Sequence, residues 1–571
     1  MDPVTLEVIK GAIRSARQEM ATLIERTSMS QSIREKLDYF AAIFDRNGRM
    51  VSGTDMPLGA NIIDIITEHY PPEDMRPGDL YWYNDCYASR GGVSHSPDLV
   101  LIAPVFYEGN LVAFSEAWGH MQDIGGLAPG SNSPLSTEIY HEGIIMPPTR
   151  LEREGIRNEE LFQVFVRNSR YPDTLKGDVR ALIAAVRLGE TRIKEMCKRF
   201  GEDVAMSAFE GLIEQTCEGI RQFVDDNIPD GIYSFEDWLD GDVHQDRSFA
   251  IRLTLTKKKG DLSFDFTKSD DQGRGTLNFI MDESVPKLML GVYAMSYNPT
   301  LLTNDGCCRA LGQVNIREGS ILDPKFPAPL GQRTATWLRV NSCLFGAIGK
   351  ASNGEVPASS PYMAVVTYRW PKDNPSQFGF AFDGLAIGHG ARPFADGHDA
   401  IFYIGQRDMP VEYSELEFPF RVEQYAIHMD SGGPGKFRGG CGIIRDYRIL
   451  RDGLIARHTM DNVLYPPWGI AGGDYGRPGR FILNPDTPSS KDLPAKGDNL
   501  RLLEGDVLRA MTCGGGGWGN PFERDPLLVL DDTRCGMVSR EAAQTDYGVI
   551  IDNNMTMDTE ATSQIRKEAP L

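Results

Sequence analysis

The sequence predicts an α+β fold with a mixed, multi-layer architecture. Apolar runs separated by turn residues recur along the chain and predict β-hairpins, whereas one central segment repeats its apolar residues at helical spacing. The second half is rich in glycine and proline and carries short β-type segments. A chain of 571 residues is too long for one hydrophobic core. We therefore predict four consecutive regions, at residues 1–157, 158–230, 231–300 and 301–571.

The N-terminal region begins with a predicted amphipathic helix over residues 4–28, which starts at Asp2-Pro3. Two short strands then flank an Asn-Gly turn at residues 45–48 and predict a first hairpin. Asp38 stands at the entrance to this hairpin and, taken alone, is interpreted as a turn or capping residue. Residues 60–70 have the pattern of a short helix.

A second hairpin is predicted from the apolar runs at residues 99–106 and 110–118, which a turn at residues 107–110 joins. The pair His95 and Asp98 precedes this hairpin, and the pair His120 and Asp123 follows it. Strand pairing would bring the two pairs together, and two imidazoles with two carboxylates suit a divalent metal such as zinc, manganese or iron. Spacing alone is equally compatible with ordinary buried histidines, because no HExxH motif is present.

The later elements follow from periodicity and turn residues in the same way. A loop with one short strand is expected at residues 138–148, before the helical segment. The further predicted elements are helices within residues 158–226, a hairpin of strands 248–256 and 262–267, a helix at 284–298, strands at 334–340, 362–370 and 421–429, and a last helix at 539–546 with Ser539 as its N-cap, before a frayed tail.

Two glycine-dense loops, at residues 431–442 and 513–521, are candidate anion cradles because consecutive backbone N–H groups bind anions. Neither loop has the Lys-Ser/Thr ending of a P-loop or a GxGxxG motif between a strand and a helix. The favoured interpretation is a set of tight turns in which only glycine tolerates a positive φ.

Composition and charge exclude several classes of protein. The formal net charge of −21 argues against binding to nucleic acid or to anionic membranes. No apolar run reaches the roughly 18 residues that span a bilayer, and the N-terminus lacks a signal-peptide pattern, so a cytoplasmic location is expected. The nine scattered cysteines predict neither a disulfide framework nor a zinc motif. No GxSxG motif supports a serine nucleophile.

Six ordered blocks of the chain resemble the hydantoinase B family. This family comprises the B subunits of ATP-dependent hydantoinases and lactamases and the matching half of 5-oxoprolinase, and large subunits of acetone carboxylase-type enzymes are related to it. The blocks begin SIREKLDYFAAIFDRNGRMVSG, RPGDLYWYNDCYASRGGVSHSPD, GHMQDIGGLAPGSNSP, IGHGARPFADGHDAI, MDSGGPGKFRGGCG and GGGGWGNPFERDPLL.

The resemblance implies a divalent metal, zinc, manganese or iron, bound by Asp38, His95, Asp98 and His120. It places Asp123 outside the ligands, where this aspartate would orient a ligand or accept a proton, so that His120 and Asp123 are the catalytic candidates. ATP would be bound by a partner, the hydantoinase A-type ATPase subunit, and not by this chain. A hetero-oligomer with two or more copies of each subunit is expected.

The chain departs from the pattern of many hydrolytic members at three positions. Met121 stands where they have a second histidine, and Cys86 and Ser96 replace residues of two other family motifs. The resemblance implies that these positions line or border the site, which leaves the substrate open.

Three functions are therefore weighed. The first is ATP-dependent opening of a cyclic amide (hydantoin, N-methylhydantoin, 5-oxoproline or lactam) after the A subunit phosphorylates its carbonyl oxygen. The second is ATP-dependent carboxylation of a ketone through an enol phosphate. The third is a non-catalytic scaffold for the ATPase, which would bind no metal. Chain length favours the first function, because acetone carboxylase-type subunits usually carry extra sequence.

Overall fold

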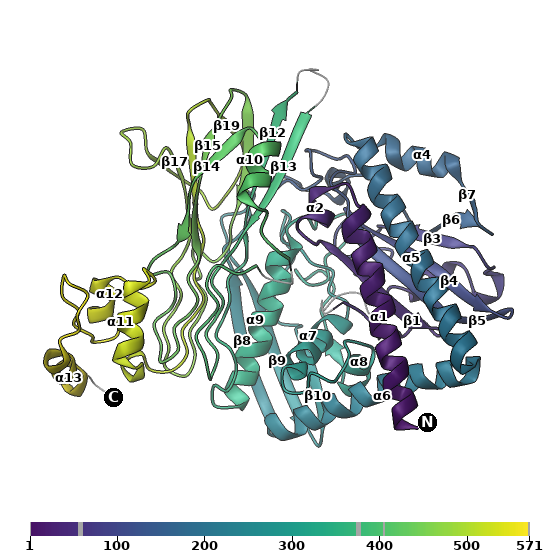
Figure 1. Cartoon of the computed structure of the whole chain (residues 1–571), viewed down its shortest axis with the longest axis horizontal. Coiled ribbons are helices and arrows are strands. Elements are labelled where there is room, and N and C mark those ends of the chain that lie inside the picture. The colour runs from purple at the N-terminus through teal and green to yellow at the C-terminus, as the bar shows by residue number, and fades with distance from the viewer. Residues whose placement is uncertain (1, 55–60, 373–377, 403–405, 569–571) are drawn as a thin grey trace. The chain divides into compact units, whose positions relative to one another are not determined.

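The computed structural model describes residues 2–54, 61–372, 378–402 and 406–568 (Figure 1). The chain forms two compact units: unit 1 comprises Met1–Ile232 and Leu253–Trp337, and unit 2 comprises Tyr233–Arg252 and Leu338–Leu571. The described residues contain thirteen α-helices and four sheets, which confirms the predicted mixed fold class. The four predicted regions follow changes along the sequence, whereas the two units are defined by packing, so that division stays a prediction.

Unit 1 is built on a seven-stranded antiparallel sheet with the strand order β2-β1-β5-β4-β3-β6-β7. Both predicted hairpins belong to it. Its strands are β1 (Tyr39–Asp45), β2 (Met50–Ser52), β3 (Leu80–Tyr83), β4 (Asp98–Tyr107), β5 (Asn110–His120), β6 (Thr149–Arg153) and β7 (Ile156–Arg157).

Helices cover one face of this sheet. Alternate strand residues such as Leu99, Leu101 and Ala117 pack against Met20 of α1 (Pro3–Thr27) and Leu182 of α5 (Pro172–Phe200). Figure 1 shows both helices lying along the sheet. The other helices of this N-terminal part are α2 (Gln31–Arg34), α3 (Asp64–His69), α4 (Glu159–Arg167) and α6 (Glu202–Asn227), and of the helix predicted at 60–70, residue 60 lies outside the described residues.

The rest of unit 1 consists of loops and of further helices and strands. The predicted strand within residues 138–148 is absent from this described segment, where the 3₁₀-helix η2 (Ile139–Glu142) forms instead. The remaining elements are η1 (Pro72–Asp74), β9 (Phe249–Lys258), β10 (Asp261–Asp265), β11 (Val314–Asn315), α7 (Ser284–Met295) and α8 (Gly306–Ala310). The chain passes between the units three times, within β8 (Gly231–Leu239), within β9 and within the helix α9 (Arg333–Ala351).

Helix α9 corrects a sequence prediction, because residues 334–340 were expected to form a strand. The local alternation of threonine with apolar residues favours β structure. In the structure the same residues are buried on nearly all sides, and so are Cys343, Leu344 and Ala347 further along the helix. A helix buried all round has no polar face, so its sequence lacks the amphipathic period that identifies surface helices.

Unit 2 contains two further antiparallel sheets, with the orders β13-β12-β16-β19 and β14-β15-β20-β17-β18. Their strands are β12 (Ala364–Pro371), β13 (Phe378–Leu385), β14 (Phe420–Ile427), β15 (Ile443–Ile449), β16 (Leu454–Thr459), β17 (Arg480–Leu483), β18 (Lys491–Leu493), β19 (Lys496–Leu502) and β20 (Val507–Met511). The other elements are β8 (Gly231–Leu239), α10 (Val411–Glu417), η3 (Pro521–Glu523), α11 (Pro526–Arg534), α12 (Arg540–Thr545) and α13 (Thr559–Glu568). Ser539 caps α12 as predicted, whereas α13 forms where a frayed tail was expected, and residues 569–571 lie outside the described residues.

The glycine-dense loops 431–442 and 513–521 were interpreted as tight turns, and this interpretation is wrong for all their glycines except Gly519. Gly519 has a φ of +73°, whereas the other glycines of these loops have no positive φ. Their backbones instead pack directly against one another: a Cβ on Gly432 would lie 2.0 Å from the carbonyl oxygen of Gly439, and one on Gly516 2.0 Å from that of Trp468. These positions require glycine because no side chain fits between the backbones.

Among the described residues, no helix combines the length and apolar composition that crossing a membrane requires.

Candidate functional site

Three neighbouring strands bring four predicted ligands to one end of the seven-stranded sheet. Asp98 opens β4 and pairs directly with His120, the last residue of β5. The His120 N–H donates to the carbonyl oxygen of Asp38, which precedes β1, at 3.0 Å. His95 lies in the turn before β4, where its carbonyl oxygen accepts from the Asp98 N–H. Leu99 packs against the helices, and a Cβ added to Gly119 would meet Ile33 and Leu182. Because side chains alternate along a strand, those of Asp98 and His120 project from the sheet face opposite α1 and α5.

The side-chain atoms of three of these residues converge. His95 Nε2 lies 2.8 Å from Asp98 Oδ1 and 3.0 Å from His120 Nδ1, and His120 Nδ1 lies 3.1 Å from Asp98 Oδ1. Asp38 stands slightly apart, with its Oδ2 3.9 Å from His120 Nδ1. The hairpin prediction therefore brought His95, Asp98 and His120 together correctly, and Asp38 lies at the edge of the same cluster.

This donor set fits a divalent metal. Two imidazole nitrogens lie only 3.0 Å apart, and both lie close to Asp98 Oδ1, an arrangement that a shared proton or a bound cation stabilises. Separations of about 3 Å are those expected between nitrogen and oxygen ligands of one ion with bonds of about 2.1 Å. Imidazole and carboxylate donors suit zinc, manganese and iron alike.

Charge and burial set the protonation of the three donors. Burial lowers the pKa of His95 to about 3, and the positive charge of Arg333 acts in the same direction, so this imidazole is neutral at physiological pH. Burial acts to raise the pKa of Asp98, but His95, His120 and Arg333 outweigh it and hold this pKa well below its usual range. Asp98 is therefore a carboxylate. Burial also acts to lower the pKa of His120, yet the hydrogen bond with Asp98 and the charge of Asp38 raise it.

The cluster is closed on one side and open on the other. The side chains of His95 and Asp98 are 2% and 6% exposed, whereas those of His120 and Asp38 are 14% and 23% exposed. A molecule from solvent therefore reaches the cluster from the side of His120 and Asp38.

Sequence reasoning missed Arg333, which lies 235 residues after Asp98 and contacts it in the structure. Its Nη2 lies 3.4 Å from Asp98 Oδ2, and its Nε donates to Ser94 Oγ at 3.0 Å. Ser94 Oγ in turn donates to Asp98 Oδ2 at 3.2 Å. No local motif marks this arginine, since only the tertiary fold brings the start of α9 next to β4.

The structure places Asp123 outside the cluster. Its Oδ1 accepts from the N–H groups of Gly125 and Arg170, and its Oδ2 accepts from the Gly130 N–H and from Arg170 Nη1, at distances of 2.8 to 3.2 Å. Among the described residues these bonds occupy both carboxylate oxygens and none goes to a candidate ligand. The contacts favour a role in fixing the 123–130 loop, and a role as proton acceptor stays a prediction without support here.

Asp123→Ala is expected to loosen this loop without removing a metal. The change leaves Arg170 and two backbone N–H groups without their buried acceptor, which costs about 3 kcal/mol. We expect a lower unfolding temperature but unchanged metal content by elemental analysis. Asp173→Ala, which alters an aspartate whose side chain is 91% exposed on α5, is the control. Loss of metal in Asp123→Ala would instead show that Asp123 belongs to the metal site.

A second buried carboxyl, Glu142, lies beside the segment that leads into Arg333. Its Oε1 accepts from the N–H groups of Leu330 and Gly331, both at 2.7 Å, and its Oε2 is buried without a partner in the described part of the chain. Burial raises the pKa of Glu142 to about 8, although the two N–H groups and Arg333 act to lower it. The folded chain therefore favours the protonated form of Glu142.

Glu142→Gln is expected to raise stability increasingly as the pH rises above 4.5, with the full effect near pH 8. The stabilising effect of the neutral carboxyl is present below the ordinary pKa of 4.5 and is lost as the pH rises through about 8. Glutamine keeps the Oε1 acceptor and does not ionise. The free energy of unfolding of the variant therefore does not fall by the roughly 3 to 5 kcal/mol that the wild type loses. Unfolding temperatures at pH 5 and pH 9 should differ less in the variant than in the wild type. The exposed Glu138→Gln serves as control, and equal pH dependence in all three proteins would contradict the assignment.

The three positions that depart from the family pattern are all buried. Met121 packs in the core on the helix side of the sheet, so the expectation that it borders the site is wrong. Cys86 is buried with its Sγ 3.7 Å from the Asn84 carbonyl oxygen, and burial raises the pKa of its thiol. The Ser96 carbonyl oxygen accepts from Asn84 Nδ2, which ties these two positions together. Cys86 and Ser96 therefore belong to the buried packing that holds His95 in place, and neither residue is exposed at the surface.

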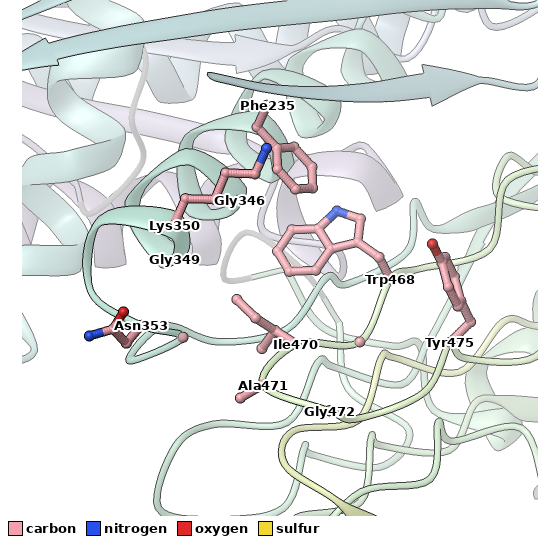
Figure 2. A pocket seen from close by; sticks show the side chains of 12 residues that line it. Phe235, Gly346, Gly349, Lys350, Asn353, Trp468, Ile470, Ala471, Gly472 and Tyr475 are labelled. Carbon is pink, nitrogen blue, oxygen red and sulfur yellow. The ribbon is translucent and has the colours of Figure 1, made fainter. Parts of the chain in front are cut away.

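A separate cavity lies within unit 2, and none of the candidate ligands lines it (Figure 2). Its volume is about 420 Å³, and Phe235, Trp468, Ile470 and Tyr475 line it together with several glycines. Its lysine, Lys350, donates its Nζ to the Ser234 carbonyl oxygen at 2.6 Å. This lining offers an apolar hollow without a catalytic or metal-binding set of side chains.

Comparisons with known proteins agree with the resemblance predicted from the sequence. The model of the hydantoinase B/oxoprolinase family matches residues 2–521. The chain is 29% identical to a putative B subunit of a D-/L-hydantoinase from Pseudomonas sp. strain NS671, over 99% of its own length and 98% of that of the relative.

Two solved structures share the fold. The crystal structure of the ATP-dependent caprolactamase from Pseudomonas jessenii matches with a TM-score of 0.87 and 26% identity, covering 99% of this chain and 100% of that one. A nucleotide-free acetone carboxylase structure matches with a TM-score of 0.87 over 100% of this chain and 83% of that one, but at 18% identity it shows the fold alone. Because the family model spans most of the sequence, this chain belongs to the hydantoinase B/oxoprolinase family.

Proposed function

We propose that this chain is the metal-dependent B subunit of an ATP-dependent hydrolase that opens a cyclic amide. The ring would be a hydantoin, N-methylhydantoin, 5-oxoproline or another lactam. The observation that carries the proposal is the convergence of His95, Asp98 and His120 in a chain whose relatives include a putative hydantoinase component and an ATP-dependent caprolactamase.

His95, Asp98 and His120 would hold the metal, with Asp38 as the fourth ligand, and zinc, manganese or iron would suit these donors. A divalent ion bound there would supply Lewis acidity, which activates water and polarises oxygen atoms. The protein would orient these ligands. Ser94 and Arg333 donate to Asp98 Oδ2, and the Asp38 carbonyl oxygen accepts from the His120 N–H.

The partner would be a hydantoinase A-type ATPase that phosphorylates the carbonyl oxygen of the ring, and ATP would bind there and not on this chain. Phosphorylation makes the carbonyl carbon a better electrophile, and this chain would bind the activated ring and exclude bulk water. Asp38 has the most exposed side chain of the cluster, at 23%, so water would enter beside this ligand. A hetero-oligomer with two or more copies of each subunit is part of the proposal.

A cytoplasmic location also belongs to the proposal. All nine cysteines are free in the structure, and seven of them are buried. Free thiols in this number are typical of a reducing compartment.

Reconstitution with an A-type ATPase tests the function. The complex should hydrolyse ATP in the presence of a cyclic amide and open its ring, without any need for bicarbonate. The test panel should hold hydantoins, lactams and 5-oxoproline, with alkyl and aryl ketones as the alternative substrates. Activity only with a ketone and bicarbonate would identify a carboxylase component instead, and a purified chain without metal would favour a scaffold.

A further inference from the structure

Arg333 adds a positive charge to the candidate metal centre, next to Asp98. Two of its three nitrogens are engaged, Nε with Ser94 Oγ and Nη2 with Asp98 Oδ2. The third, Nη1, has no partner among the described residues, and 15% of the side chain stays exposed. The guanidinium is therefore held in place from one side while one donor nitrogen remains available to a ligand.

The start of α9 is anchored so that this arginine has little freedom to move. The carboxyl of Glu142 binds the N–H groups of Leu330 and Gly331, three and two residues before Arg333. The Arg333 N–H itself donates to the Leu330 carbonyl oxygen at 2.9 Å. A donor fixed by both its backbone and its side chain loses little conformational entropy when it binds a ligand.

The charges around Arg333 favour an anion. With a divalent ion bound, the carboxylates of Asp38 and Asp98 would balance its charge, and Arg333 would add one positive charge to the site. The adjacent hollow lined by residues 91–94 and Asp98 has a volume of about 10 Å³, which is room for one water and not for a phosphoryl group. An anion therefore has to approach from solvent, through the exposed part of the Arg333 side chain.

We propose that Arg333 forms a phosphoryl-binding subsite beside the candidate metal centre. Its Nη1 would bind an oxygen of the phosphoryl group that the activated substrate carries, and would hold the carbon bonded to the phosphorylated oxygen next to His95, Asp98 and His120. Guanidinium is the side-chain group best suited to phosphate oxygens, because its planar donors match their geometry. The inference rests on the proposed function, since that function supplies a phosphorylated substrate.

Inorganic phosphate is the probe, because it carries the same oxygens without the ring. The full chain would be loaded with Mn²⁺, and the ³¹P relaxation rate of phosphate would report its binding near the ion. Phosphate affinity would be measured independently by titration calorimetry on the metal-free and the Mn²⁺-loaded chain. We expect Arg333→Gln to weaken phosphate binding at least tenfold, and Arg333→Lys to retain part of it because the charge remains.

Arg317→Gln is the matched control, since this partly exposed arginine of unit 1 binds the carbonyl oxygens of Thr267 and Ser269 and the Asp271 carboxylate. Manganese content is measured for every variant. If Arg333→Gln also loses manganese, calorimetry on the metal-free chains decides. Equal phosphate affinity in wild type and Arg333→Gln, or no phosphate binding in the wild type, would overturn the subsite.

The two proposals fail separately. If the reconstituted complex opens a ring while Arg333→Gln binds phosphate as the wild type does, the subsite is wrong and the function stands. If no cyclic amide is opened but phosphate binding depends on Arg333, the subsite stands and the ring-opening function is wrong.

Discussion

Replacing His95 and His120 together with alanine is expected to abolish metal binding and the activity of the reconstituted complex. The double variant leaves Asp98 as the only member of the close triangle, and the two nitrogens removed are 2.8 and 3.1 Å from its Oδ1. A single carboxylate with Asp38 nearby does not retain a divalent ion against water. We expect metal content below roughly one tenth of that of the wild type, and activity lower by a factor of roughly 10³ or more.

Elemental analysis of the purified chain and ring opening by the complex are the two measurements. His69→Ala is the control, because His69 is exposed on α3 and its Nδ1 is bonded only to the Ile65 carbonyl oxygen among the described residues. An unfolding curve close to that of the wild type would show that the double variant is folded. Intact metal content and activity in the double variant would show that the metal site lies elsewhere.

Gly515→Ala is expected to prevent correct packing of unit 2. The added Cβ would lie 2.1 Å from the His389 carbonyl carbon and oxygen and 2.4 Å from the Gly390 nitrogen. All three atoms belong to the backbone, so no side chain can rotate away. Gly515 also donates to the Gly440 carbonyl oxygen at 3.0 Å and accepts from the Gly433 N–H at 2.8 Å, which ties it to the second glycine-dense loop.

We expect a cost of about 4 kcal/mol or more, at the upper end of the range for overpacking, since backbone atoms must move. Thermal unfolding and limited proteolysis would detect it as a lower transition temperature and earlier cleavage in residues 338–571. Gly11→Ala is the control, because this helical glycine has nothing within 4 Å of an added Cβ and alanine favours the helix by about 1 kcal/mol. A transition temperature for Gly515→Ala within about 2 °C of the wild type would contradict the packing argument.

Local sequence patterns predicted much of unit 1. The helix α1 and both hairpins follow from apolar periodicity and from turn residues, and these signals act over a few neighbouring residues. The pairing of β4 with β5 then placed His95, Asp98 and His120 close together, because a short turn sets the register of a hairpin. The structure confirms this proximity at the level of single atoms.

Other features depended on contacts that no local pattern contains. Asp123 has the same spacing from His120 as Asp98 has from His95, yet it turns away to bind Arg170. Helix α9 carries a strand-like sequence but is buried on nearly all sides, so packing overrides its local preference. The glycines of the two loops were attributed to backbone conformation, whereas close packing between backbone segments remote in sequence requires them.

The sequence by itself determined the two hairpins and the three converging metal-site candidates, because each of these depends on residues close together along the chain, and six ordered blocks indicated the family. The tertiary structure alone decided that Arg333 and Ser94 hold Asp98 and that Glu142 anchors the start of α9. It also decided that the Met121 side chain packs in the core and not at the site. The physical reason is distance along the chain. Periodicity reports which face of an element is buried, but only folding shows which remote side chain lies against it.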